Sequence, residues 1–412
     1  MDKHKGIKTD LGKINAQIGM VPVEAPAQLE KKDSQLVIGI NKASSYQERR
    51  VSLTPQSVSL LVNRGHEIFV HSGAGEGSNY YDADYTEAGA QIVYTTEELY
   101  KRSRIIVSVT PPTLEEVAVM SPGQIILSPL HLPEMDAKII KKMMSKKVTA
   151  VAYEYLKDSF GTYPMVRSMG EIAGNASLLI AAEQLSNVNG GKGVLLGGVA
   201  GVPPAKVVIL GAGVVGEYAA RTAIGMGAIV KVFDNNTYKL MRLQNNLNTR
   251  IYTSIIDPEI LLKELKDCNV CIGAIHAKEG RTPVVVTESM VSHMKSGAVI
   301  VDVSIDQGGC FETSEVTAHD NPTFKKYGVV HYCVPNIASR VSRTGSQAVS
   351  HIVTPILLNA SENGGLENHV WKEEGVRSGL YIYNGALTNE YLGEKFDIKY
   401  TDLELLLAAK LF

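Results

Sequence analysis

The chain has 412 residues, a formal net charge of −2 at pH 7 and four cysteines. Its length predicts two or three domains, and its nearly balanced charge provides no general attraction to nucleic acid or to an anionic membrane. No apolar run is long enough to span a membrane, and the first residues lack the apolar core of a signal peptide. The cysteines are also few, so we expect a cytoplasmic protein.

Residues 1–34 are charged and show no sustained hydrophobic period, so we expect a poorly ordered N-terminal extension. From residue 35, short β-branched apolar runs alternate with amphipathic segments, which predicts strands alternating with helices. Thr54 followed by Pro55 is typical of a helix start, and Gly65 of its end. The strands expected in this first unit are residues 36–40, 66–73, 91–94, 104–109, 124–128 and 148–155, and the helices are 53–65, 82–89, 95–103 and about 134–146.

A long apolar helix is expected to begin at Ser168, which has Glu171 three residues later as in a capping box, and to end near residue 186. A glycine-rich loop then leads into a new series of strands and helices that ends near Asn336. A second helical stretch, at about 344–362, can carry the chain back to the first unit. That unit is therefore expected to be discontinuous, with the C-terminal segments packed against it.

Alternating strands and helices of this kind imply parallel sheets with helices on both faces. We therefore expect an α/β protein with two Rossmann-like doubly wound domains. The substrate domain should comprise residues 35–167 and 345–412. The dinucleotide-binding domain, together with the linking helices, should comprise residues 168–344 and be inserted into the substrate domain.

Residues 206–234 contain the full pattern of a dinucleotide-binding turn. An apolar run ends at Gly211, Gly213 and Gly216, spaced as GxGxxG, and an alanine-rich helix follows. The first glycine permits a tight turn, the second leaves room for the pyrophosphate, and the third lets the helix pack closely on the sheet.

The first turn of the expected helix contains Val214 and Val215. This end of the helix directs free N–H groups and the positive end of the helix dipole toward the phosphates. Asp234 ends the second apolar run, about 20 residues beyond the glycines. A carboxylate at that place can accept hydrogen bonds from both ribose hydroxyls and repel a 2′-phosphate. The sequence therefore predicts NAD rather than NADP as the cofactor.

Cys268 and Cys271 form a CxxC pair, which is also typical of redox and zinc sites. The surrounding segment DCNVCIGA has the pattern of a buried strand within the dinucleotide domain, and no second ligand pair has matching spacing. We therefore expect no metal site here.

Several polar residues lie just beyond expected strands, where open α/β sheets bind their ligands. Arg50 can hold a carboxylate with its guanidinium, His131 can exchange a proton near neutral pH, and Asp306 can orient a base or bind a polar group. These three residue types suit the reduction of a 2-oxo acid. The residues at or near strand ends are Arg49, Arg50, Thr110, His131, His276, Lys278, Asp306, Gln307 and Asn336.

Each of these residues also has a structural interpretation that spacing leaves open. A histidine that follows a strand is more often packed or solvated than catalytic. Arg50 could form a solvated charge cluster with Arg49 and Glu48, and the glycines after Asp306 could simply turn the chain. His276 could contact the cofactor or lie in a surface loop.

From about residue 35 to 361 the chain resembles the family of alanine dehydrogenases and the α subunit of NAD(P) transhydrogenase. The resemblance is carried, in order, by ERRVSLTPQSV, GHEIFVHSGAGEGS, GGKGVLLGGVAGVPPAKVVILGAGVVG, VDVSIDQGGCFETS and HYCVPN. The segments LHL, with His131, and IDQGG, with Asp306, are similar to the dehydrogenase branch. The transhydrogenase α subunit lacks this histidine.

This resemblance implies a role for each of five residues. Arg50 is expected to bind the substrate carboxylate, and His131 and Asp306 are expected to be catalytic. Asp234 is expected to bind the adenosine ribose, and Asn336 to line the nicotinamide pocket as a substrate-binding residue. The family is hexameric, so the resemblance also implies a homohexamer.

Two positions depart from the family pattern. Thr110 stands where alanine dehydrogenases normally have a lysine that contacts the substrate, and the charge-assisted hydrogen bond that is lost contributes about 1.5–3 kcal/mol. Gly170 stands where the family commonly has a serine near the cofactor. We keep Thr110 as a substrate-binding candidate, and Gly170 and Gln307 as cofactor-binding candidates.

The expected activity is the reversible, NAD-dependent oxidative deamination of L-alanine to pyruvate and ammonia by hydride transfer to nicotinamide. Two alternatives stay open at this point. One is hydride exchange between dinucleotides with an NADP-binding partner, as in transhydrogenase. The other is a non-catalytic NAD-binding module, which Thr110 and Gly170 favour. The expected partners are small substrates and copies of the chain, with no nucleic acid and no membrane.

Overall fold

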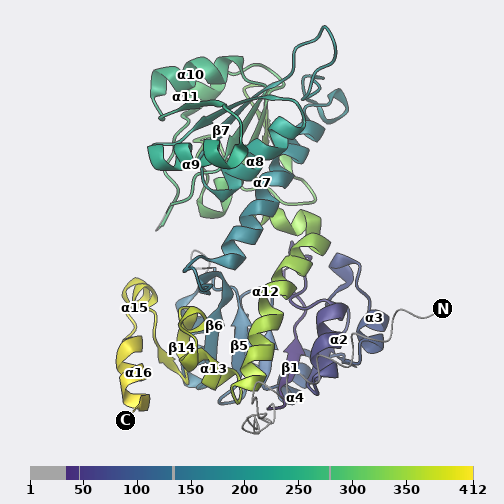
Figure 1. Cartoon of the computed structure of the whole chain (residues 1–412), viewed down its shortest axis with the longest axis vertical. Helices are drawn as coiled ribbons and strands as arrows, with labels where there is room; N and C mark the ends of the chain where they lie inside the picture. The colour runs from purple at the N-terminus through teal and green to yellow at the C-terminus, as the bar shows by residue number, and fades with distance from the viewer. Residues whose placement is uncertain (1–33, 46, 132–134, 278–279, 412) are drawn as a thin grey trace, which may run out of the picture.

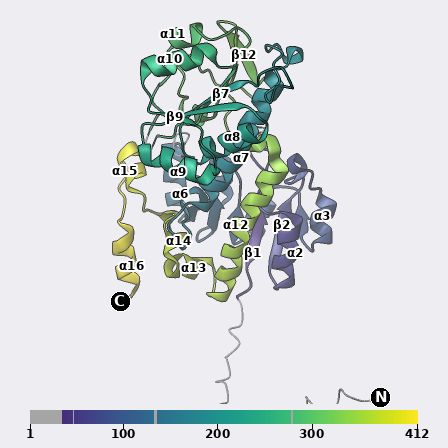
Figure 2. The ribbon, with the colours of Figure 1, turned by 45° about the horizontal axis from the view of Figure 1, so that its top comes forward.

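The computed structural model describes residues 34–411 apart from residues 46, 132–134 and 278–279, so the expected N-terminal extension lies, except for Ser34, outside the described residues. The chain forms two units, each built around one β-sheet, and two long helices run between them (Figure 1). These helices are α7 (Pro164–Gln184) and α12 (Ser342–Glu362). They contact each other where the two units meet (Figure 2).

The first sheet has eight strands in the order β15-β14-β6-β5-β4-β1-β2-β3. Strands β1 to β6 run parallel, whereas β14 and β15 pair antiparallel at one edge. Because β14 and β15 come from the C-terminal part of the chain, the first unit is discontinuous. The strands are β1 (Val37–Ile40), β2 (Glu67–His71), β3 (Gln91–Val93), β4 (Ile105–Val107), β5 (Ile125–Ser128), β6 (Thr149–Ala152), β14 (Leu380–Tyr383) and β15 (Ala386–Leu387).

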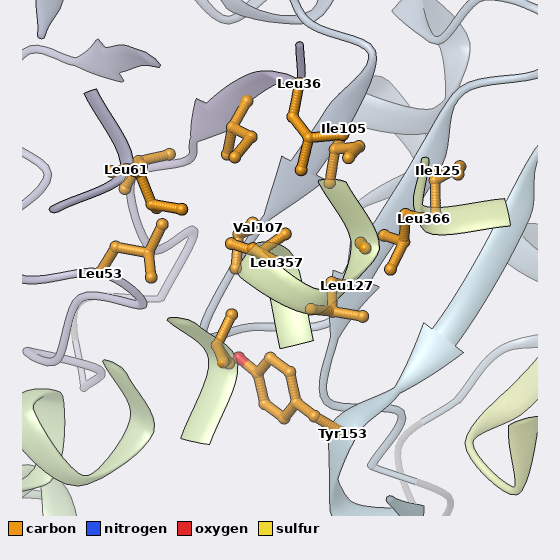
Figure 3. Packing of buried hydrophobic residues seen from close by; sticks show 14 of the residues in the cluster. Leu36, Leu53, Leu61, Ile105, Val107, Ile125, Leu127, Tyr153, Leu357 and Leu366 are labelled. Atoms are coloured by element: carbon orange, nitrogen blue, oxygen red, sulfur yellow. The ribbon is translucent and has the colours of Figure 1, made fainter. Parts of the chain in front are cut away.

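Both faces of the first sheet are covered by hydrophobic cores. Because successive side chains of a strand point to opposite faces, a single strand contributes to both cores. In β4, Ile105 and Val107 belong to the core on one face and Ile106 to the core on the other. Leu357 of α12 joins Val107 and Leu127 in the first of these cores (Figure 3). The helices of this unit are α2 (Pro55–Asn63), α3 (Asp82–Glu87), α4 (Thr96–Arg102), α5 (Leu114–Val119), α6 (Ala137–Ser145), α13 (Leu366–Lys372), α14 (Glu374–Arg377), α15 (Glu390–Phe396) and α16 (Leu403–Leu411).

The second sheet has seven strands in the order β12-β13-β11-β10-β7-β8-β9, all parallel except β12 at one edge. All of these strands come from the chain between α7 and α12, so the second unit is inserted into the first. The protein is thus an α/β protein with two Rossmann-like sheets. The strands are β7 (Lys206–Leu210), β8 (Ile229–Phe233), β9 (Tyr252–Ser254), β10 (Val270–Gly273), β11 (Val299–Asp302), β12 (Thr323–Lys326) and β13 (Val329–Tyr332), and the helices are α8 (Val214–Gly225), α9 (Thr237–Leu247), α10 (Pro258–Asp267) and α11 (Glu288–Ser292).

Two helices differ from the sequence-based expectation. Helix α7 begins at Pro164 rather than at Ser168. Proline favours the first helical position because its φ is already helical and its missing N–H is not needed there, so the helix starts one turn before the expected capping box. Helix α5 was not predicted, although Thr113 and Glu116 form a capping box at its start.

Candidate active site

The candidate residues gather where parallel strands end. Strands β1, β4 and β5 are neighbours in the first sheet, so their carboxyl ends lie along one edge. Arg50 lies in the loop after β1, Thr110 follows β4, and His131 follows β5. In the second unit, Asp306 and Asn336 follow β11 and β13, which are also parallel neighbours.

Arg50 is almost fully buried, and its charge is paired within its own loop. Both Arg50 and Glu48 have only 8% of their surface exposed. Arg50 donates from Nε to Glu48 Oε1 at 2.8 Å and from Nη2 to Glu48 Oε2 at 2.5 Å, which makes the pair bidentate. Arg50 Nη1 lies 2.9 Å from the Sδ atom of Met169 in α7. The guanidinium is therefore held in one orientation.

Each member of this ion pair stabilises the charged form of the other, which burial alone would disfavour. Burial alone would raise the pKa of Glu48, but the Arg50 guanidinium and the side chain of Asn336 hold it below its usual value. Burial alone would lower the pKa of Arg50, but Glu48 raises it, with further contributions from Tyr153 and Asp306. The carboxylate of Asp306, from the second unit, thus acts on the arginine of the first.

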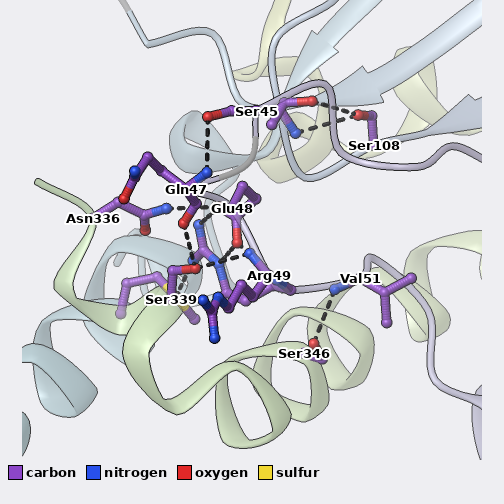
Figure 4. Close-up of polar contacts among 12 residues, drawn as sticks. Ser45, Gln47, Glu48, Arg49, Val51, Ser108, Asn336, Ser339 and Ser346 are labelled. Atoms are coloured by element: carbon purple, nitrogen blue, oxygen red, sulfur yellow. Dashed lines mark hydrogen bonds and ion pairs between the residues drawn. The ribbon is translucent and has the colours of Figure 1, made fainter. Parts of the chain in front are cut away.

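Asn336 connects the two units. Its φ is 53°, in the left-handed region that asparagine tolerates better than most residues. Its backbone N–H donates to Asp306 Oδ1 at 2.8 Å, and its Nδ2 donates to Glu48 Oε2 at 2.7 Å. Figure 4 shows Asn336 reaching toward Glu48 from its own segment. A continuous chain of contacts therefore runs from Arg50 through Glu48 and Asn336 to Asp306.

His131 is exposed and lies in the loop that follows the carboxyl end of β5, a central strand of the first sheet. Its φ is 46°, which is unusual for a residue other than glycine. Its backbone N–H donates to Glu154 Oε1 at 3.0 Å. Glu154 lies in the turn η2 (Tyr153–Tyr155), directly after β6. An exposed imidazole at this place can exchange a proton with a bound ligand.

Thr110 lies in a cluster of hydroxyl groups and has only 6% of its surface exposed. Its Oγ1 accepts hydrogen bonds from Ser44 N at 3.4 Å and from Ser44 Oγ at 3.2 Å, and lies 3.3 Å from Ser108 Oγ. The backbone N–H of Thr110 donates to Ser108 Oγ at 3.2 Å. The hydroxyl of Thr110 is therefore engaged within the protein, and its position offers no positive charge.

The glycines of the fingerprint form a close-packed turn with one open position. A Cβ atom on Gly216 would lie 1.9 Å from the carbonyl oxygen of Gly211, so only glycine fits where α8 packs on the sheet. Gly211 has a φ of 108°, which excludes most other residues. By contrast, no heavy atom of the described residues lies within 4 Å of a Cβ built on Gly213. This open approach to the start of α8, at Val214 and Val215, fits a pyrophosphate group.

Asp234 lies directly after β8 and is bound to this turn. Its Oδ2 accepts the N–H of Ala212 at 2.8 Å, and its Oδ1 accepts the N–H of Asn236 at 2.7 Å. Arg242 of α9 approaches the same turn, with Nη2 located 3.4 Å from the carbonyl oxygen of Ala212. A carboxylate held beside the glycine turn has the position needed to bind ribose hydroxyls.

Gly170 and Gln307 have packing contacts near the same turn and near a neighbouring loop. A Cβ on Gly170 would lie 3.3 Å from Val214 Cγ1, so α7 passes close to the first turn of α8. Gln307 accepts the N–H of Ala277 at 3.1 Å and donates to its carbonyl oxygen at 3.2 Å. It thereby fixes the loop that follows β10, where His276 is exposed. Lys278, also in that loop, lies outside the described residues.

The cysteines of the CxxC pair are buried and carry free thiols. Burial raises the pKa of Cys268 to about 12 and the pKa of Cys271 well above its usual value, so both stay protonated near neutral pH. Within the described part of the chain, no group of three or more His, Cys, Asp or Glu side chains is placed to hold a metal ion.

Two carboxylates at this site were not predicted from the sequence. Glu48 was named only as a possible member of a solvated charge cluster, and Glu154 was not singled out. A glutamate two residues before an arginine is common in surface loops, so the local sequence alone does not reveal burial. Both become recognisable only when segments distant in the chain cover them, because Asn336 contacts Glu48 and Leu130 contacts Glu154.

The fold and the site together define a class of protein: a two-unit α/β protein with a glycine turn of the dinucleotide-binding type in one unit, and with Arg50, His131 and Asp306 each in a segment that follows a parallel strand. Two family models match the chain, "Alanine dehydrogenase/PNT, N-terminal domain" over residues 39–173 and "Alanine dehydrogenase/PNT, C-terminal domain" over residues 177–390. The chain belongs to the alanine dehydrogenase/PNT family.

Curated relatives and solved structures agree with this assignment. The chain is 38% identical over 370 residues to an alanine dehydrogenase of Methanococcus maripaludis, covering 90% of this chain and 99% of that protein. It is 38% identical over 377 residues to an alanine dehydrogenase of Mycolicibacterium smegmatis, covering 90% and 100%.

Two solved structures have the same fold. An L-alanine dehydrogenase structure matches with a TM-score of 0.81 and 35% identity, covering 87% of this chain and 99% of that chain. A transhydrogenase from Sinorhizobium meliloti matches with a TM-score of 0.73 over 86% of this chain and 99% of that one. At 23% identity, this second match shows the fold alone.

Proposed function

We propose that the protein is an NAD-dependent L-alanine dehydrogenase, which converts L-alanine to pyruvate and ammonia reversibly. The observation that carries this proposal is the chain of contacts from Arg50 through Glu48 and Asn336 to Asp306, which joins a carboxylate-binding group to the unit with the dinucleotide turn. The relatives that match almost the whole chain are named alanine dehydrogenases. They favour the dehydrogenase over a transhydrogenase subunit.

Each candidate residue has a proposed role. Arg50 binds the substrate carboxylate with the part of its guanidinium that Glu48 does not occupy. His131 accepts or donates the proton that accompanies oxidation or reduction at the substrate carbon, and Asp306 orients the substrate nitrogen and the ammonia that leaves. The nicotinamide, when bound, supplies the carbon that accepts or donates the hydride. Asn336 lines the nicotinamide pocket, and Thr110 lines the substrate side through its hydroxyl cluster.

We propose NAD as the cofactor. Gly211, Gly213 and Gly216 with the first turn of α8 bind the pyrophosphate, and Asp234 binds the adenosine ribose. Gly170 and Gln307 complete the site, Gly170 beside the first turn of α8 and Gln307 through the loop that follows β10. Because the Asp234 carboxylate repels a 2′-phosphate, NADH should bind far more tightly than NADPH. Equal binding of the two in a fluorescence titration contradicts this proposal.

The direct test is consumption of NADH by the purified protein in the presence of pyruvate and ammonium, with a panel of other small 2-oxo acids in parallel. Turnover of pyruvate supports the proposal. Turnover of another oxo acid alone contradicts the substrate, NADH binding without any turnover indicates a non-catalytic module, and activity only with an NADP-binding partner indicates a transhydrogenase-like subunit.

The role of His131 gives a sharper prediction. His131→Ala should reduce kcat for alanine oxidation by about 10²–10⁴ if the imidazole transfers the proton. His293, which is exposed at the end of α11, provides the matched control, because His293→Ala should leave kcat unchanged. An unchanged kcat in His131→Ala assigns proton transfer to another group.

We also propose the quaternary organisation and location. We propose that the substrate domain comprises residues 35–167 and 345–412 and that the dinucleotide-binding domain comprises residues 168–344, because α7 and α12 are the segments that run between the sheets.

We propose a homohexamer, which fits the exposed apolar side chains that follow α7, and light scattering tests this assembly. A monomer at micromolar concentration contradicts it. These side chains are Val188, Leu195, Val199 and Val202, exposed by 91%, 66%, 61% and 58%.

The proposed location is the cytoplasm, supported by the four free cysteines. In the described part of the chain, no helix has both the length and the apolar character required to cross a membrane. Fractionation of cells that produce the protein tests the location, and recovery outside the cytoplasmic fraction contradicts it.

A further inference from the structure

A buried carboxylate holds the turn that carries His131. Glu154 Oε1 accepts hydrogen bonds from two consecutive backbone N–H groups, that of Leu130 at 2.6 Å and that of His131 at 3.0 Å. Both amides belong to the loop after β5, whereas Glu154 follows the neighbouring strand β6. The side chain therefore ties together the carboxyl ends of two adjacent strands.

The backbone of this turn needs such support. His131 has a φ of 46°, and a side chain with a Cβ is disfavoured in the left-handed region. Residues in such conformations persist when their surroundings fix them, and they are frequent at functional sites. Here the fixing contacts are the two hydrogen bonds to Glu154, which set the direction in which the imidazole leaves the chain.

The second carboxylate oxygen of Glu154 differs from the first in its contacts with the described residues. Among the described residues, Glu154 Oε2 is buried and has no hydrogen-bond partner. Burial accordingly raises the pKa of Glu154, although its contacts with Leu130 and His131 oppose the rise. A buried oxygen without a partner destabilises a fold, and groups of this kind are concentrated at sites of chemistry.

The charged surroundings of Glu154 point to His131 as its electrostatic partner. Among the residues that the structure describes, the phenols of Tyr153 and Tyr155 act on this carboxylate from its own turn, and the phenol of Tyr381 from β14. These phenols are neutral near pH 7, because burial raises the pKa of each. From the loop after β5, the charge of His131 favours the ionised carboxylate.

We propose that Glu154 is a positioning residue for His131: its carboxylate fixes the turn that carries the exposed imidazole and provides the negative charge that stabilises the imidazolium. This inference rests on the proposed role of His131 in proton transfer. During alanine oxidation, His131 takes up a proton, and the positive charge that forms is then balanced by Glu154. In the reverse direction, the proton returns to the substrate and the balance is released.

The variant Glu154→Gln separates the two parts of this role. Its amide oxygen can still accept both backbone hydrogen bonds, but the negative charge is lost. Removal of a carboxylate lowers the pKa of a neighbouring imidazole, by about one unit for a close pair. Because the neutral imidazole is the active form in alanine oxidation, the acidic limb of the kcat/KM profile should move to lower pH by about one unit, with the melting temperature unchanged.

Two further variants bracket this result. Glu154→Ala removes the acceptor as well as the charge, so it should reduce kcat more than Glu154→Gln does. Glu98→Gln removes a solvent-accessible carboxylate on helix α4 and should leave the pH profile in place. An acidic limb at the same pH in wild type and Glu154→Gln overturns the proposal, because it shows that no charge of Glu154 reaches the imidazole.

Direct titration of His131 by NMR distinguishes this inference from the proposed function. The His131 resonance is assigned by its absence in His131→Asn, and its pKa is compared between wild type and Glu154→Gln. A lower pKa in the variant supports the pairing even if alanine is not the substrate. An equal pKa overturns it even if the protein oxidises alanine.

Discussion

At the scale of single residues, the site depends on charges that are buried together. Arg50 and Glu48 are each exposed by only 8%, and the pair is closed by a further hydrogen bond from Asn336. A buried ion pair adds little net stability, because desolvation offsets the attraction. Loss of one partner is a different matter, since the other charge then stays buried without compensation.

The variant Glu48→Gln tests this dependence. It leaves the Arg50 guanidinium buried without its counter-charge, so the free energy of unfolding should fall by about 3–5 kcal/mol, measured by urea titration. Glu98→Gln breaks the exposed Arg102–Glu98 pair and should change stability by less than about 0.5 kcal/mol. Similar losses in the two variants contradict the burial argument.

Acid should weaken the same ion pair. The pKa of Glu48 is lowered in the folded protein, so its contribution to stability is present above the unfolded value of 4.5 and is lost as the pH falls through the lower folded value. Wild-type protein should therefore lose more stability below pH 4.5 than Glu48→Gln does. Denaturant titrations at a series of pH values give the comparison, and parallel curves for the two proteins contradict it.

At the scale of elements, the glycine turn separates folding from ligand binding. A Cβ at Gly216 meets the backbone of Gly211 at 1.9 Å, whereas a Cβ at Gly213 meets no described atom within 4 Å. The packing of the protein thus requires one glycine, whereas the other leaves open space in which the proposed pyrophosphate can bind. The two positions are matched controls for each other.

Gly213→Ala should leave the melting temperature unchanged. It should weaken NADH binding by tenfold or more, because the added Cβ clashes with the pyrophosphate; a tenfold change corresponds to about 1.4 kcal/mol of binding free energy. Gly216→Ala should lower the melting temperature, because its Cβ must displace backbone. Thermal unfolding and NADH fluorescence titration measure the two effects. Undiminished NADH affinity in Gly213→Ala places the pyrophosphate elsewhere.

At the scale of the whole molecule, the loop after β1 contacts the second unit in addition to the two long helices α7 and α12. Ser339 Oγ donates to the carbonyl oxygen of Gln47 at 2.9 Å and accepts the N–H of Arg49 at 2.9 Å. Gln47 also accepts the N–H of His319 at 2.9 Å. Because Arg50 lies in the same loop, the geometry of the proposed carboxylate site depends on how the second unit is placed.

Asn336→Gly tests this dependence, since glycine keeps the left-handed backbone but removes the hydrogen bond to Glu48. A hydrogen bond to a charged group contributes about 1.5–3 kcal/mol of free energy. If this energy is lost from transition-state binding, kcat/KM for alanine should fall by roughly ten- to a hundredfold. Asn384, which has a φ of 46° in the first unit, is the control, because Asn384→Gly should leave kcat/KM unchanged. Equal kcat/KM in both variants indicates that the link has no role in activity.

The sequence by itself determined the fold class and the dinucleotide turn of this protein. Periods of two and 3.6 residues, proline and glycine at helix ends, and the spacing of Gly211, Gly213 and Gly216 are local signals, so they can be interpreted without tertiary contacts. The strand ends also predicted Arg50 and His131 as candidates, because parallel strands end along one edge. The start of α7 was misplaced because Pro164 outweighs the capping signal at Ser168.

Only the tertiary structure decided which of those side chains are in contact. Glu48 is buried beside Arg50 because Asn336, 288 positions later, covers it, and Glu154 supports His131 across 23 positions of sequence. Thr110 was predicted as a substrate-binding candidate, and the structure adds that its hydroxyl accepts a hydrogen bond from Ser44. The physical reason is that burial and charge pairing depend on distances between segments, which local sequence patterns do not encode.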